Sequence, residues 1–258
     1  MSKQIWTYNG LSLSKLGKWD VEEVIEGIGI PKYRGSNLQI PFQHGNRWMK
    51  KRFDRRRVVL SMWIRGTSRS DLDSNIDLFL KGIGKSGIHT LSRTMRSGEV
   101  REAQAEIASE INFVTKNPGY AKFALEFEIP ETFFYGTTKA IMSRDIGSSE
   151  VSWTVANSGT APVTGMIITL EGPLGSPKIE NTANDIWVQY QGVIADGETI
   201  IMNTKDFTCM RGTENFIAAV KHGGDAYWMA LESSENSLEI TSQEAGGRIG
   251  IEYYPAYF

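Results

Sequence analysis

Residues 153–203 alternate short apolar runs with turn sequences, and this pattern constrains the fold of the chain more than any other. The run Ile-Trp-Val-Gln-Tyr at 186–190 has the period of two that places alternate side chains on opposite faces of a strand. Asn-Ser-Gly-Thr at 157–160, Gly-Pro at 172–173 and Asp-Gly at 196–197 are turn sequences, and Asp-Gly is typical of a β-hairpin. The segment therefore predicts a meander of short strands and no helix.

Short apolar runs separated by Gly and Asn continue to the end of the chain. We expect further strands at 216–220, 228–231, 238–240 and 249–253. Many short strands without a helical pattern are typical of two packed sheets. Residues 151–258 are therefore predicted to form a β-sandwich domain.

The N-terminal half combines strands with a helix. At 56–66 the apolar residues occupy every second position, which predicts a strand with one buried face. The same alternation occurs at 103–107 and 123–129. We predict a sheet covered by one helix over residues 1–136, so the chain as a whole should be mainly β, with an α+β domain first and a sandwich second.

The helix is expected between Ser70 and about Lys81. Ser70 with Asp73 resembles a capping box in which Asp replaces the usual Glu, and Gly82 or Gly84 would end the helix. The apolar residues that fall on one stripe of this helix are Leu72, Ile76, Phe79, Leu80 and Ile83.

Two further segments organise the chain between these elements. Residues 31–45 mix extended residues with Gly and Pro turns, which predicts a protruding hairpin. Residues 137–150 are polar and separate two regions that each have their own apolar periodicity, so we predict a linker there.

The composition excludes several classes of function but does not indicate one. A chain of 258 residues can bury two cores of ordinary size, and its formal charge of −2 gives no overall attraction to nucleic acid. The single Cys209 cannot form an internal disulfide, no apolar run approaches the ~20 residues of a membrane span, and the three histidines match no metal motif. We expect a soluble protein without membrane insertion, cofactor, metal ion or catalytic residues.

A dense basic run follows the expected hairpin. It is interpreted as a subunit interface, and a solvated strand end is one alternative. Contact with phosphate or nucleic acid is the other alternative, because Trp48 and Phe53 interleave with the basic side chains. We expect no sequence-specific nucleic-acid binding. The residues assigned to this candidate interface are Arg47, Lys50, Lys51, Arg52, Arg55, Arg56 and Arg57.

Turn and core motifs recur along the chain in a characteristic order. In the N-terminal half they are Tyr33-Arg-Gly35, Asn37, Ile40-Pro41, Gly45, the basic strand ending at Gly66, the helix at 71–80 and the aromatic segment 130–135. In the C-terminal half they are Asn157 to Thr160, Leu170 to Gly172, Pro177 to Asn181, Gly197-Glu198, Trp228 to Leu231 and Asn236 to Ile240. In this order and spacing the chain resembles the siphophage distal tail protein family over nearly its whole length.

The resemblance implies a structural role. Members of this family form a hexameric ring at the distal end of a long non-contractile tail, built from N-terminal belt domains that carry galectin-like C-terminal domains. It therefore implies a homo-hexamer that connects the tail tube protein to the tail hub or tip protein and lets DNA pass. Tape measure and receptor-binding proteins are further implied partners, and the implied location is the virion, after assembly in the host cytoplasm.

A carbohydrate-binding module for host adhesion is the alternative from another functional class. β-Sandwiches carry sugar sites on exposed aromatic side chains, and Trp187 and Trp228 are the candidates for such a contact here. Core packing is the competing interpretation of both tryptophans. A hydrolase would need converging carboxylates or a catalytic triad, and the sequence indicates neither.

Overall fold

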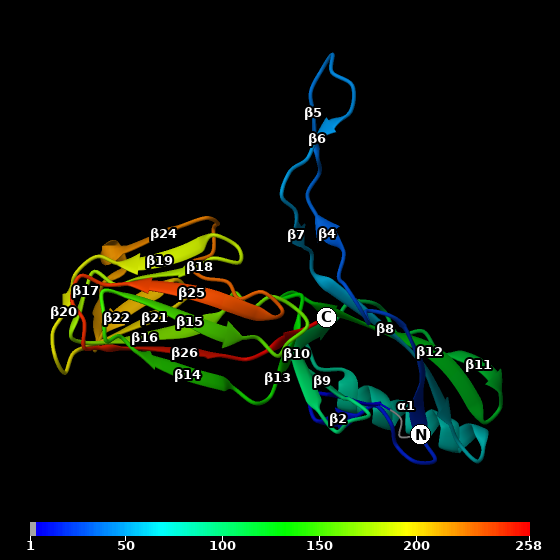
Figure 1. Cartoon of the computed structure of the whole chain (residues 1–258). Helices are drawn as coiled ribbons and strands as arrows, with labels where there is room; N and C mark the ends of the chain where they lie inside the picture. The colour runs from blue at the N-terminus through cyan, green and yellow to red at the C-terminus, as the bar shows by residue number, and fades with distance from the viewer. Residues whose placement is uncertain (1–3) are drawn as a thin grey trace. The chain divides into compact units, whose positions relative to one another are not determined.

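The computed structural model describes residues 4–258 and is built mostly of β-strands (Figure 1). The chain divides into two compact units, of which the first reaches Tyr135 and includes Phe258, and the second comprises Gly136–Tyr257. Among the described residues there is one α-helix, and it belongs to the first unit. The predicted mainly β fold is confirmed.

One large sheet forms the first unit, with the strand order β2-β1-β9-β10-β12-β8-β3. All pairings given along this order are antiparallel, and β11 adds to one end of β12. The strands are β1 (Ile5–Tyr8), β2 (Leu11–Ser12), β3 (Trp19–Glu26), β8 (Arg56–Arg65), β9 (His89–Thr94), β10 (Val100–Ile107), β11 (Val114–Asn117), β12 (Tyr120–Ile129) and β13 (Phe134–Gly136).

Strands β8 and β12 pair along their whole length and supply the centre of the first core. Their period of two places every second side chain on the buried face, as predicted for both segments. The buried apolar residues of that face are Val58, Leu60, Met62 and Ile64 on β8, and Phe123, Leu125, Phe127 and Ile129 on β12. Arg56 has the same phase as Val58, and it is buried as well.

The helix α1 (Arg69–Ile83) covers this core but starts earlier than predicted. Its N-cap is Ser68, whose hydroxyl accepts from the Asp71 backbone N–H at 3.2 Å, so the predicted pair of Ser70 and Asp73 is wrong. The carboxylate of Asp71 accepts from the Thr67 N–H at 2.7 Å and from the Thr67 hydroxyl at 3.0 Å, and these two bonds lower its pKa. The Ser68 hydroxyl thus satisfies one of the free N–H groups of the first turn. The residues that α1 buries are Leu72, Asn75, Phe79 and Ile83, whereas Leu80 is exposed.

The second unit is a sandwich of two antiparallel sheets. One has the order β14-β26-β16-β21-β22-β23 and the other β15-β25-β18-β19-β24. The first sheet comprises β14 (Ala140–Asp145), β16 (Met166–Glu171), β21 (Thr199–Asn203), β22 (Thr208–Arg211), β23 (Glu214–Asn215) and β26 (Arg248–Tyr253). The second comprises β15 (Glu150–Ala156), β18 (Lys178–Asn181), β19 (Ile186–Tyr190), β24 (Val220–Gly223) and β25 (Glu235–Thr241), and the short strands β17 (Leu174–Gly175), β20 (Val193–Ile194) and β27 (Ala256–Tyr257) complete the unit.

Several segments of the second unit differ from the sequence prediction. The expected linker at 137–150 contains β14, which pairs with β26 from Ala140 to Asp145. This strand lies at the edge of its sheet, so its polar side chains remain exposed to water. Its sequence therefore resembles that of a linker. The expected strand at 216–220 instead begins as the 3₁₀-helix η1 (Ile217–Ala219).

The turn at Asp196 and Gly197 is present, but it joins strands of different sheets. Strand β20 before the turn pairs with β17, and β21 after it pairs with β16, so no hairpin forms there. Gly197 has φ 77°, which explains the Gly in this turn. The predicted turn is therefore confirmed, whereas the predicted hairpin pairing is wrong.

The expected strand at 228–231 is also absent, apart from an isolated bridge between Val163 and Leu231. Asparagine side chains hold the segment instead. The Asn181 amide donates to the Ala230 carbonyl and to Asn236 Oδ1, at 2.8 Å each. These side chains replace the ladder of a strand pair, which explains a buried segment with no strand partner.

Cys209 lies in the core of the second unit, and burial raises the pKa of its thiol to about 11. The reactive thiolate is therefore scarce at pH 8. We expect no reaction with a disulfide reagent such as 5,5′-dithiobis(2-nitrobenzoate) while the protein is native, and one equivalent of reaction after unfolding in guanidinium chloride. Rapid native reaction at pH 8 would show that this part of the core opens readily.

Candidate functional site

A two-stranded ribbon projects from the sheet of the first unit between β3 and β8 (Figure 1). We call residues 31–53 the arm. It consists of β4 (Tyr33–Arg34) paired with β7 (Arg52–Phe53), and of β5 (Leu38–Gln39) paired with β6 (Asn46–Arg47). A protruding hairpin is present as predicted, but it extends beyond 31–45, because the basic run supplies its returning strands β6 and β7.

The arm exposes large apolar side chains. Phe42 at the tip is fully exposed and has φ 65°, a conformation that an aromatic residue rarely adopts, and Trp48 is 70% exposed. Tyr33, Leu38 and Met49 are exposed as well. Clustered exposed apolar side chains usually mark an interaction surface.

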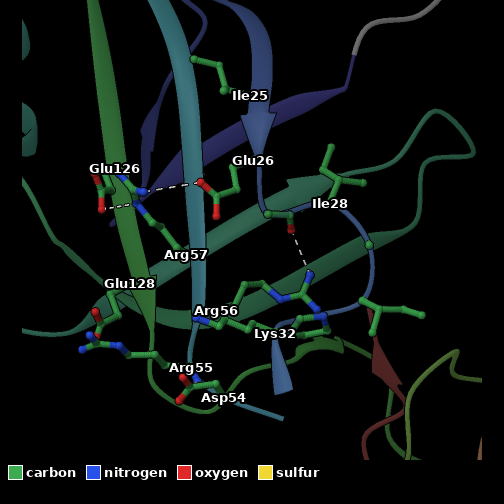
Figure 2. A pocket seen from close by; sticks show the side chains of 14 residues that line it. Ile25, Glu26, Ile28, Lys32, Asp54, Arg55, Arg56, Arg57, Glu126 and Glu128 are labelled. Atoms are coloured by element: carbon green, nitrogen blue, oxygen red, sulfur yellow. Dashed lines mark hydrogen bonds and ion pairs between the residues drawn. The ribbon is translucent and has the colours of Figure 1, made fainter. Parts of the chain in front are cut away.

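Arg56 fixes the root of the arm. Only 2% of this residue is exposed. Its Nε donates to the Thr132 carbonyl at 2.7 Å and its Nη1 to the Gly27 carbonyl at 3.0 Å. Figure 2 shows the guanidinium directed toward the segment that follows Glu26. Burial, with repulsion from Arg93 as the smaller cause, lowers the Arg56 pKa to about 10, so the group stays charged at neutral pH.

Thr132 also binds the segment between β7 and β8 at this root. Its hydroxyl donates to the Asp54 carbonyl at 3.0 Å, while its own carbonyl accepts from Arg56. Thr132 has φ 73°, which is strained for a β-branched residue. The bonds on both sides of Thr132 hold it in this conformation, so the root is fixed by polar contacts from three segments.

An aromatic cluster packs against the root within the first unit. The Phe53 ring stacks on Tyr33 across the β4–β7 pair, with centroids 4.7 Å apart. Phe53 also meets Phe133 and Phe258 edge-on, at 5.5 Å and 5.3 Å. Such ring pairs add to the stability from burial, so the base of the arm is anchored while its tip is not.

Arg55 and Arg57 point outward and bind carboxylates of the neighbouring strand β12 (Figure 2). Arg55 Nη1 lies 2.8 Å from Glu128 Oε1, and Arg57 makes a two-pronged contact with Glu126 in which Nη2 lies 2.6 Å from Oε2. The contact with Arg57 lowers the pKa of Glu126. These pairs line a groove of about 680 Å³ beside the exposed Ile28.

The basic run therefore divides into three structural groups. Arg56 is buried, so its assignment to the interface is wrong: it shares the inward phase of β8. Arg55 and Arg57 are paired within their own sheet. The four remaining residues of the predicted interface lie on the arm, and they are Arg47, Lys50, Lys51 and Arg52.

The two tryptophans proposed for sugar contact differ in their placement. Trp228 is 4% exposed and meets Phe207 edge-on at 5.6 Å, so it offers no open face for stacking, and its assignment is corrected to core packing. Trp187 is half-buried on the outer face of the five-stranded sheet, with Lys178 Nζ 5.0 Å from its ring centroid. Its ring lies against Gly223, where a Cβ would approach it to 2.7 Å.

Within residues 4–258, no group of three or more His, Cys, Asp or Glu side chains is arranged to hold a metal ion. None of the helical segments in the same range is long and apolar enough to cross a membrane.

Comparison with known proteins decides the relationship that the motifs suggested. Residues 17–129 match the family model of the phage tail protein RIFT-related domain. The chain carries a phage tail RIFT-related domain. This domain covers most of the first unit and includes the whole arm. None of the curated proteins compared with the chain matches it.

The crystal structure of SPP1 Dit matches 98% of this chain and 100% of its own, with a TM-score of 0.67 and 12% sequence identity. That protein is described as a paradigm of the hub adsorption apparatus in phages that infect Gram-positive bacteria. A chain of the phage P2 baseplate in its activated conformation with Ca matches 98% of each chain at 12% identity, but its TM-score of 0.41 supports no argument. The predicted resemblance to distal tail proteins is confirmed, and the fold is that of Dit.

Proposed function

We propose that this chain is the distal tail hub of a long non-contractile phage tail. Both units match SPP1 Dit together across 98% of the chain, and this observation carries the proposal. In the proposed role six copies form a ring at the distal end of the tail tube, join the tube protein to the tail hub or tip protein, and leave a channel for DNA. The protein would work as a structural part of the virion, without catalysis, after assembly in the host cytoplasm.

The arm supports an assembly role on physical grounds. A monomer that keeps Phe42 and Trp48 in water loses the free energy that their burial would provide, about 1.5–3 kcal/mol for a fully buried aromatic side chain. Exposed aromatic and Arg side chains are also the types that dominate binding energy at protein interfaces. The arm residues Arg47, Lys50, Lys51 and Arg52 are proposed contacts in the assembly, with a neighbouring copy or another tail protein as partner.

The ring is tested by light scattering coupled to size-exclusion chromatography and by negative-stain images of the purified chain. We expect a mass of six chains or a multiple of six, and rings in the images. A chain that stays monomeric at high micromolar concentration would contradict the proposed hub.

The double variant Phe42→Ser, Trp48→Ser is expected to lose assembly, because both side chains become polar at an exposed surface. Its thermal unfolding should remain that of the native monomer, since neither residue is buried. Leu16→Ser is the matched control, because Leu16 is fully exposed on the same unit outside the arm. If the control and the double variant assemble alike, the arm is not an assembly contact.

A further inference from the structure

Charge is distributed very unevenly along this nearly neutral chain. The arm has six Lys and Arg and no Asp or Glu, which gives it a net charge of +6. The second unit has seven basic and fifteen acidic residues and a net charge of −8. The remainder of the first unit has fifteen of each and is neutral. The arm and the second unit therefore have opposite charges of similar size.

Four of the fifteen carboxylates of the second unit lie on the outer face of its five-stranded sheet, which also carries Lys178 and Lys221. Glu180 on β18 is directly opposite Glu239 on β25, and like charges in that position destabilise a sheet. Of these two glutamates only Glu180 forms an ion pair, in which Lys178 Nζ lies 2.5 Å from Glu180 Oε2. Among the described residues Glu150, Glu235 and Glu239 make no ion pair, and all three are exposed. We call Glu150, Glu180, Glu235 and Glu239 the carboxylate face.

The carboxylate face also has an apolar feature. Trp187 pairs directly with Glu180 across β18 and β19, and its indole lies over Gly223 on the next strand. The other outward side chains of β15 and β25 are short, being Ser152, Thr154, Ser237 and Thr241. An extended ribbon that presents cations and aromatic rings could lie along such a face without steric obstruction.

We propose that the arm of one copy docks on the carboxylate face of a second copy. Arg34, Arg47 and Lys51 make no ion pair among residues 4–258, so they are available to the exposed glutamates. Each copy has one arm and one carboxylate face, so the contact is head-to-tail, and head-to-tail contacts generate closed rings when the rotation between copies closes. The proposal rests on the self-assembly of the proposed hub and names the surfaces that carry it.

Reciprocal charge reversal tests the contact in the full chain. The arm variant Arg47→Glu, Lys51→Glu and the face variant Glu235→Lys, Glu239→Lys should each weaken assembly at least tenfold at low salt. The variant with all four changes should restore assembly, because the charges of both surfaces are then reversed and the two surfaces attract each other again. Glu214→Lys with Glu244→Lys is the matched control, since both residues are exposed on the second unit outside the carboxylate face.

Cross-linking identifies the two surfaces and the copies to which they belong. A carbodiimide joins a lysine amine to a carboxylate with loss of water, so we expect links from Lys50 or Lys51 to Glu235 or Glu239. In a mixture of ¹⁴N- and ¹⁵N-labelled protein, about half of these links should join one light and one heavy peptide. Links only between peptides of the same label would show docking within one chain and overturn the proposal.

The outcomes separate this contact from the proposed hub. If the wild-type chain remains monomeric, both the proposed hub and the proposed contact are contradicted before any variant is compared. A wild-type ring that the face variant also forms normally contradicts the contact alone. The arm variant and the face variant could both lose assembly while the variant with all four changes fails to restore it. That result would also overturn direct docking, because each surface would then contribute to assembly through a different partner.

Discussion

Replacing Arg56 with alanine is expected to lower the free energy of unfolding of the first unit by about 3 kcal/mol. The change leaves the buried Thr132 carbonyl and the part-buried Gly27 carbonyl without their donors, and a buried group left unpaired costs about 1–3 kcal/mol. The measurement is urea unfolding, with hydrogen exchange to localise the loss. Exchange should increase first at the root of the arm, because the guanidinium joins segments that are far apart in the sequence there.

Arg55→Ala is the matched control for Arg56→Ala. Arg55 is adjacent in sequence and equally charged, but its side chain is 65% exposed and pairs with Glu128 at the surface. Exposed ion pairs contribute about 0–1 kcal/mol, so this variant should unfold almost as the wild type does. If both variants lose the same free energy of unfolding, the charge of these residues and not the burial of Arg56 determines the stability of the root. A variant that reverses the charge of Arg55, Arg56 and Arg57 together would place a carboxylate at the buried Arg56 position and disrupt the fold. Such a variant therefore cannot test whether these residues form an interface.

The burial of Arg56 could have been read from the sequence, because Arg56 has the phase of Val58, Leu60, Met62 and Ile64. The density of positive charge favours a surface location for the whole run, although a strand alternates its side chains whatever their charge. The long strands were predictable for the same reason: the buried face of one strand is a local pattern. What that pattern does not contain is the acceptor of the guanidinium, since Gly27 and Thr132 are brought to Arg56 only by the tertiary fold.

The misread segments of the second unit have a related cause. Strand β14 at an edge has only one neighbour and few buried residues, so its polar sequence gave no strand signal. Residues 228–231 gave a false signal because they are apolar and buried without being a strand. The partner of each segment lies far away in the sequence. The motifs at Asn157, Asn181 and Asn236 were visible, but their role as hydrogen-bonding partners of buried backbone appears only in the structure.

Replacing Asn236 with alanine is expected to lower the stability of the second unit by about 3 kcal/mol. This fully buried amide accepts from the Glu232 N–H at 2.7 Å and from Asn181 at 2.8 Å, and it donates to the Ser234 carbonyl at 2.9 Å. Removal leaves the buried Asn181 amide and the part-buried backbone groups of Glu232 and Ser234 incompletely paired, and such losses add up within one network. Ser237→Ala on the same strand is the control, because that side chain faces outward and its carbonyl bonds do not depend on it. Urea unfolding should separate the two variants by most of the 3 kcal/mol, and similar midpoints would show that packing of Trp228 and Leu231 alone holds the segment in place.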